Sequence, residues 1–459
     1  MWQGAVWSVR RTPSLRPDDP MDAVVEDRDA TGEFVNPTAI HVLFAIYLST
    51  IWLTPDIHAP VGAFEGIPAY VILTPLILVI QGRRAVMAGL AIGAVLFTYE
   101  FCKNFQSDYQ ETMKGILGLI ALSALLPTIY YALISVLRCP PDFIGKWLVN
   151  TLLLIFAAIV VENFLGPMGL VHSKYPHYFL PIRSYSGFFA EPSHVAIALA
   201  PFLIMATFDF RLYRRYLGMT GVWCLIATVL ICSSATEFGI LAMAMVALAL
   251  KNASQGRFFN LLAVTAFTGA AGVAALSVQK ISERVMNMMM PKTALIMSNP
   301  EALSNLALLK GLEMALYALQ HMPLGVAFLN MAALSSHARI SHISIMMAHL
   351  DSSDGASILF KGVCEFGYVF LAFILFAVVK IALQLWRFDR TSAHALQGLF
   401  VIACEFAFLT MFLRSSSYFW GTTAIAIAVL VFPPPPSLFP SRRGPQRSEL
   451  PEGASLAAT

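Results

Sequence analysis

Long apolar runs recur along the whole 459-residue chain and constrain its fold more than any other feature. A helix needs roughly 20 mostly apolar residues to cross the hydrocarbon core of a bilayer. Charged residues make up only 12% of the chain, whereas a soluble protein carries about a quarter. We therefore predict an all-α polytopic membrane protein with about 12 transmembrane helices. The predicted spans are residues 37–54, 66–82, 85–102, 113–137, 145–165, 192–208, 217–234, 236–250, 259–278, 358–380, 394–413 and 416–433.

The short basic loops between these spans predict the orientation, because cytoplasmic loops are enriched in lysine and arginine. With the N-terminus inside, every short basic loop falls on the cytoplasmic side. The sequence thus predicts an N-in, C-in chain of the bacterial inner membrane. The loops are "GRR" at 82–84, "RLYRRY" at 211–216, "KNASQGR" at 251–257 and "WRFDR" at 386–390.

The remaining chain divides around these spans. Residues 1–35 are polar and acidic and lack the apolar core of a signal peptide, so we predict a disordered cytoplasmic tail, with Met21 as an alternative start. The proline run that begins at 433 ends the last span and opens a second tail, 434–459. Spans 1–9 (36–278) include a short periplasmic loop, 166–191, and a large periplasmic loop, 279–357, precedes spans 10–12 (358–433). Within the large loop, 301–320 has the spacing of a helix at the membrane surface.

Ionisable side chains gather toward the periplasmic ends of the spans. Such groups are costly in a membrane and are functional candidates by default. For Glu100 and Glu237 the alternative is a span end that simply faces water. For Glu365 and Glu405 it is a buried ion pair or a protonated carboxyl. The acids near the periplasmic ends are Glu100, Glu162, Glu191, Glu237, Glu365 and Glu405. Lys361 and Arg414 are predicted at a similar depth in the membrane.

The stretch "SYSGFFAEPSH" (184–194) concentrates several of these groups where a span begins. Pro192 favours the first turn of a helix, which puts Glu191 at the cap, with His194 on the same side. The preceding Arg183 could bind a phosphate with a forked pair of hydrogen bonds. A helix cap with an aromatic anchor and a catalytic carboxylate are equally compatible with this pattern.

The segment "RSYSGFFAEPSHVAIALAP" resembles the signature of Wzy-type O-antigen and capsular polysaccharide polymerases, which are related to the O-antigen ligases. Four further segments resemble those proteins in the same order. Two departures stand out: Asp354, Gly355 and Ala356 replace the histidine and asparagine of the ligases, and a P-x-G-x-G motif ends in Ala327. The four segments are "CSSATEFGILAMAMVAL" (232–248), "ALYALQHMPLGVAFLNM" (315–331), "DGASILFKGVCEFGYVFL" (354–371) and "FLRSSSYFWG" (412–421).

The resemblance implies a GT-C-like, metal-independent glycosyltransferase without a cofactor. It would pass a growing glycan from undecaprenyl diphosphate to a lipid-linked repeat unit at the periplasmic face. Arg183, Arg339 and Arg414 are the candidates for stabilising the diphosphate leaving group. Glu191 is the first candidate for the general base, with His194 or His349 second.

Two alternative functions are compatible with the sequence. The departure at 354–356 favours a polymerase over an O-antigen ligase. A transporter or flippase of lipid-linked sugars is a third hypothesis, which the one-sided distribution of acids disfavours. The expected partners are undecaprenyl-diphosphate-linked oligosaccharide and membrane lipid, with a chain-length regulator and a flippase as candidates and no nucleic acid. His337, His342 and His349 lack the usual spacing of a zinc site, and we predict no metal.

Overall fold

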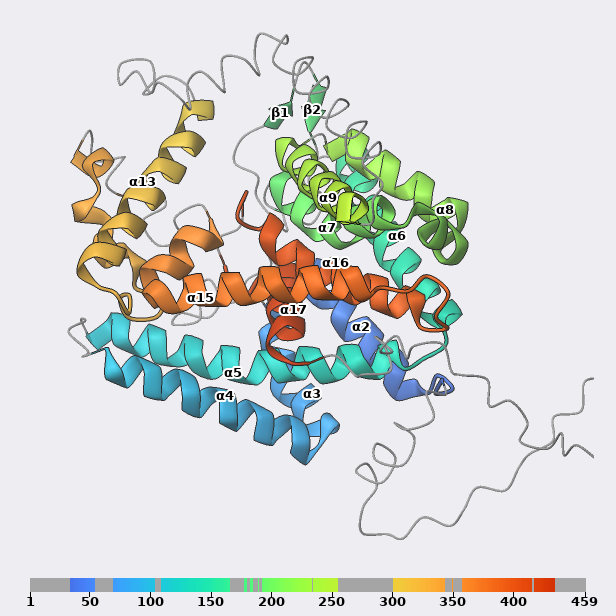
Figure 1. The fold of residues 1–459 in the computed structure, drawn as a ribbon, viewed down its shortest axis with the longest axis horizontal. Coiled ribbons are helices and arrows are strands. Elements are labelled where there is room, and N and C mark those ends of the chain that lie inside the picture. Colours follow the sequence, from blue (N-terminus) through green and yellow to red (C-terminus); the bar gives the residue numbers. More distant parts are fainter. Residues whose placement is uncertain are drawn as a thin grey trace, which may run out of the picture.

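A computed structural model of the chain describes residues 34–53, 69–103, 109–165, 177–179, 182–184, 189, 192–232, 234–254, 300–342, 349, 357–414 and 417–433. These residues form a bundle of helices and one short antiparallel hairpin (Figure 1). In the hairpin, β1 (His177–Phe179) pairs with β2 (Ile182–Ser184). The helices are α2 (Ala39–Leu53), η2 (Ala69–Leu73), α3 (Thr74–Gln81), α4 (Arg83–Cys102), α5 (Tyr109–Leu137), α6 (Pro141–Leu165), α7 (Pro192–Phe208), α8 (Phe210–Cys232), α9 (Ala235–Ser254), α13 (Pro300–His321), η3 (Met331–His337), η4 (Arg339–His342), α15 (Ile358–Arg387), α16 (Ala395–Thr410) and α17 (Gly421–Val431).

The apolar helices agree with the prediction of a helical membrane protein. Within the described residues, five helices are long and apolar enough to cross a bilayer, and five shorter apolar helices accompany them. Every predicted span except 259–278, which lies outside the described residues, coincides with a helix. The prediction of about 12 spans remains a prediction. The five long candidates are 83–102, 115–137, 141–161, 210–232 and 358–387.

Burial divides the helices into an inner and an outer set. Every residue of α16 except Leu409 is buried, and α17 is buried along almost its whole length. In contrast, α4 and α15 expose large apolar side chains such as Leu90, Val95, Leu375 and Phe376. A helix that is apolar on all sides belongs in a core, and an apolar face exposed on the outside suits lipid. The outer set therefore carries the surface expected to face the bilayer.

Contacts between loops define two ends of the bundle. At the basic end, the backbone N–H of Val35 donates to the carbonyl of Arg138 at 2.9 Å. Arg390 and Asp209 form an ion pair there at 2.7 Å. At the other end, called here the cluster end, α4 finishes, and α13 packs against α15 beside it (Figure 1). Ring contacts bring the starts of α7 and α17 to the first turns of α15, through His194 with Trp420 and Tyr418 with Phe366. The loops that meet at each end share a predicted side of the membrane.

Candidate functional site

A break in α15 organises the cluster end. Gly367 adopts φ +55° and ψ −135°, so the helix bends and local hydrogen bonds are lost. An extended segment from the loop supplies replacements: the N–H of Tyr368 donates to the carbonyl of Pro323 (2.9 Å), and the N–H of Val326 donates to that of Cys364 (2.8 Å). Buried backbone groups require such partners. The segment thus crosses the break and joins the loop to α15.

Glycine is required on both sides of this crossing. A Cβ on Gly367 would lie 2.0 Å from the carbonyl oxygen of Pro323. A Cβ on Gly325, which has φ +81°, would lie 2.4 Å from the carbonyl of Glu365. Both positions also have the left-handed φ that other residues rarely adopt. Pro323 and Gly325 belong to the incomplete P-x-G-x-G motif, so the structure gives that motif a role in crossing the break.

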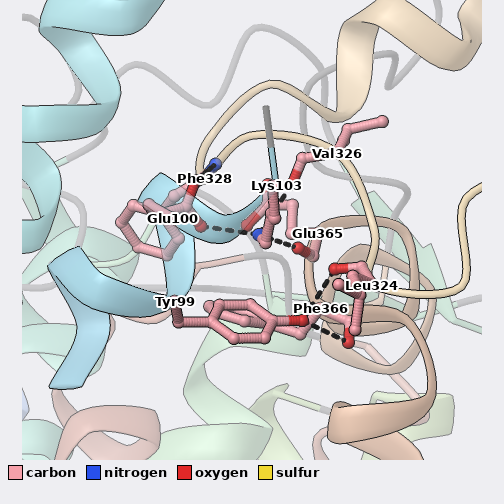
Figure 2. Close-up of polar contacts among 8 residues, drawn as sticks. All are labelled: Tyr99, Glu100, Lys103, Leu324, Val326, Phe328, Glu365 and Phe366. Carbon is pink, nitrogen blue, oxygen red and sulfur yellow. Dashed lines mark hydrogen bonds and ion pairs between the residues drawn. The ribbon is translucent and has the colours of Figure 1, made fainter. Parts of the chain in front are cut away.

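Lys103, just past the end of α4, holds the crossing in place (Figure 2). Its Nζ donates to the Glu100 carboxylate (2.6 Å), the Val326 carbonyl (2.9 Å) and the Glu365 carbonyl (2.6 Å). The second oxygen of Glu100 accepts the N–H of Phe328 at 3.2 Å. Burial lowers the pKa of the Lys103 ammonium, and the adjacent Glu100 carboxylate opposes that shift. All three elements, α4, the loop segment and α15, therefore share one buried ion pair.

The hydroxyl of Tyr99 completes this contact. It donates toward the carbonyls of Leu324 (2.7 Å) and Phe366 (3.0 Å), and its ring stacks on that of Phe366 (Figure 2). Tyr99 and Lys103 were absent from the sequence-based candidates. The aromatic residue and the cation that flank Glu100 in "YEFCK" do not reveal this role by themselves, because the carbonyl oxygens that they bind lie more than 200 positions away in the chain.

On the N-terminal side of the break, three polar side chains converge near the start of α15. Glu365 is fully buried, and Lys361 and Tyr418 are almost so. The Lys361 ammonium lies 5.6 Å from the centre of the Tyr418 ring. The Tyr418 hydroxyl interacts with the Glu365 carboxylate, although the contact falls short of ideal hydrogen-bond geometry. Lys361 and Glu365, predicted as cavity candidates, are thus brought together with a tyrosine that the prediction did not include.

Two other predicted residues are near the same end. His194, in the first turn of α7, has its ring 4.0 Å from that of Trp420, which precedes α17. Arg414 follows α16 and is half-buried. A hydrogen bond joins this region to the start of α15, since the Ser357 hydroxyl donates to the carbonyl of Phe412 at 2.9 Å. The segments 354–371 and 412–421 therefore contact one another.

Glu237 is fully buried at the start of α9. One of its carboxylate oxygens accepts the N–H of Ser234 at 3.1 Å, and the other has no partner among the described residues. Gly239, in the next half-turn, faces the side chain of Leu413. The alternative that Glu237 simply faces water is wrong, because the side chain is inaccessible. The acid instead caps α9 beside the segment that follows α16.

The grouping of Glu405 with the other acids is wrong. Its carboxylate pairs with Lys380 at 3.0 Å and accepts a hydrogen bond from Gln384 at 3.2 Å. The same lysine donates to the carbonyls of Val429 and Leu430 at the end of α17, away from the cluster end. The sequence placed Glu405 by its depth within one span, whereas its partners place it toward the basic end. The alternative of a buried ion pair is confirmed.

The remaining candidates are not joined to the cluster by any contact in the described residues. Arg339 is exposed on η4, and His349 is exposed. Arg183 lies in β2 opposite Tyr178. The side chain of Glu162 and the whole of Glu191 lie outside the described residues.

No protein-family model matches the chain, and no curated protein matches it. Within the part of the chain that the structure describes, no group of three or more histidine, cysteine, aspartate or glutamate side chains is arranged to hold a metal ion.

Proposed function

We propose that the chain is a polysaccharide polymerase of the bacterial inner membrane, acting at the periplasmic face. One observation carries this proposal: segments that separately resemble the polymerase family contact one another at a single end of the bundle. The segment 315–331 crosses 354–371 through the Val326–Cys364 and Tyr368–Pro323 hydrogen bonds. Segment 354–371 in turn meets 412–421, which faces both the start of α7 and the start of α9.

In the proposed reaction, the hydroxyl oxygen of the acceptor sugar attacks the anomeric carbon of the donor glycan. The bond from that carbon to the diphosphate oxygen breaks, and undecaprenyl diphosphate leaves with the electron pair. A base accepts the hydroxyl proton. Glu191 is the proposed base, with His194 or His349 as second choices. Arg183, Arg339 and Arg414 are the proposed cations for the leaving group.

The distribution of buried charge also supports a one-sided site. The Glu100–Lys103 pair, Lys361, Glu365 and Glu237 are all at the cluster end. Toward the basic end, Glu405 and Lys380 neutralise each other, and Lys380 also donates to the carbonyls at the end of α17. A transporter needs polar access from both faces, so this distribution favours an enzyme over the transporter alternative.

The test is complementation in the native host from which the gene has been deleted. The variants Glu191→Gln, Arg183→Ala and Arg414→Gln are expected to reach the membrane at normal levels but to yield only single repeat units on the surface lipid. Asp142→Asn, an exposed acid at the other end of the bundle, is the matched control and should give normal polymer. Protein level is followed by blot and polymer length by gel.

The outcomes separate the alternatives. Long polymer that stays on its carrier and does not reach the lipid core would identify a ligase. Loss of single repeats as well would identify a transporter. Normal polymer from all three variants would reject the assigned site.

A further inference from the structure

The residues predicted as a basic loop at 211–216 form the first two turns of α8 instead. Gly218, with φ +67° and ψ −177°, breaks the helix and sets these turns apart from the rest of α8. Arg211, Arg214 and Arg215 are exposed and form no ion pair with any residue that the structure describes. Their spacings of three and four residues put them on one face of the helix. The segment is therefore a short amphipathic helix with a cationic outer face.

Packing on the opposite face fixes the direction in which the arginines point. Leu212 and Tyr213 are buried, and the Tyr213 hydroxyl donates to the carbonyl of Gly221 across the break at 3.3 Å. The N–H of Leu212 donates to the carboxylate of Asp209 at 3.2 Å. Asp209 also pairs with Arg390, beyond the end of α15, at 2.7 Å. These contacts hold the segment against the bundle and leave the arginines on the outside.

Neighbouring charges do not balance this cationic face. The adjacent acid, Asp209, is already paired with Arg390. The segment packs against the start of α6, since a Cβ on Gly145 would lie 2.6 Å from the carbonyl oxygen of Tyr216. There α6 exposes Asp142 and Lys146, whose opposite charges cancel. The positive charge of the three arginines is therefore available to an anion.

Beyond the break, an exposed apolar stripe continues along α8 from the arginines. It consists of Met219 (43% exposed), Trp223 (62%), Ile226 (42%) and Leu230 (65%), again at spacings of three and four residues. At 1.5 Å per residue the stripe is about 16 Å long, close to half of the roughly 30 Å hydrocarbon core of a bilayer. Its length matches the acyl chains of one leaflet. A soluble phosphate or an acidic peptide would use the arginines but leave this stripe uncovered.

We propose that this face of α8 binds an anionic phospholipid. The phosphate would lie on Arg211, Arg214 and Arg215, and the acyl chains would lie along the apolar stripe. Arginine suits the head group because its guanidinium offers forked donors to phosphate oxygens. Clusters of basic residues at a membrane surface attract anionic lipids. This inference goes beyond the proposed function and does not depend on it, because the face lies at the basic end and not at the cluster end.

The test uses the purified full-length protein in phosphatidylcholine nanodiscs that contain a small fraction of brominated lipid. Bromine quenches tryptophan fluorescence on contact, so Trp223 reports which lipid lies along the stripe. Brominated phosphatidylglycerol, which is anionic, should quench more strongly than the same fraction of brominated phosphatidylcholine. High salt should reduce this excess, because it screens the arginines. Trp223→Phe should remove most of the excess and so locate the bound lipid.

Matched double variants test the arginines themselves. Arg211→Gln with Arg214→Gln should lower the preference for phosphatidylglycerol by about ten- to thirtyfold, and the corresponding pair of lysine substitutions should keep most of it. Arg83→Gln with Arg84→Gln removes two exposed arginines at the start of α4 and should leave the excess unchanged. All four side chains are exposed, so each variant should unfold at the same temperature as the unmodified protein in nanodiscs without anionic lipid.

Three results would overturn the inference. Equal quenching by the two brominated lipids would mean that the arginines are only solvated and that the stripe faces bulk lipid. An unchanged excess in the Arg211 and Arg214 double variant, or after Trp223→Phe, would place the anionic lipid elsewhere on the protein. Loss of the excess on adding free glycerol phosphate, which has the head group without the chains, would identify a site for a soluble phosphate compound instead.

Discussion

Replacing Gly367 by alanine tests whether the break in α15 depends on the loop segment that crosses it. At φ +55° and ψ −135°, any L-residue is strained by about 1–3 kcal/mol. The new Cβ would also lie 2.0 Å from the carbonyl oxygen of Pro323, which must move and release the N–H of Tyr368. Leaving that N–H unsatisfied costs about 1–3 kcal/mol more. The expected total is about 2–6 kcal/mol, from these two terms.

Gly218 provides a matched control. It also has a positive φ, +67°, and a kink in α8, but a Cβ there would meet no atom within 4 Å. Gly218→Ala should therefore cost only the backbone strain. Both variants would be unfolded at equilibrium in mixed micelles of a mild detergent and dodecyl sulfate, with tryptophan fluorescence as the signal. Equal losses of stability for the two variants would refute the argument that the crossing segment requires a glycine at 367.

Two further predictions concern packing away from the break. Lys380→Met should destabilise the protein by about 3–5 kcal/mol in the same unfolding assay, because it leaves the buried Glu405 charge uncompensated. Adding Glu405→Leu should recover much of the lost stability. A double variant that is no more stable than the single one would contradict this prediction. Gly421→Ala should cost about 1–3 kcal/mol, because its Cβ would lie 2.1 Å from the carbonyl oxygen of Ile51 and force α17 away from α2. Gly239→Ala, whose Cβ would meet only a leucine methyl, is the control and should cost less; the opposite order would show that the α2–α17 contact yields easily.

The positions of the helices could be predicted from the sequence alone. Apolar runs and the residues that end them depend on local composition, and a lipid environment makes that signal strong. The predicted start at residue 192, for example, agrees with the first residue of α7, because proline favours the first turn of a helix. The segment 301–320 likewise falls within α13.

Only the tertiary structure decided which charges meet. Depth along a span grouped Glu405 with Glu365 toward the periplasmic side, but its partners Lys380 and Gln384 on α15 hold it elsewhere. Lys103 gave no comparable signal, because its acceptors at Val326 and Glu365 are carbonyl oxygens, which carry no trace in the side-chain pattern.

The break in α15 is the clearest case of this division. An isolated glycine within an apolar run is compatible with an unbroken helix, so "EFGYVF" does not predict a break. Gly367 breaks the helix because the Pro323–Val326 segment supplies the lost hydrogen bonds, and that segment comes from a distant part of the chain. The sequence by itself determined which segments are helical and apolar. The packing of those segments determined where the helix bends and which polar groups meet.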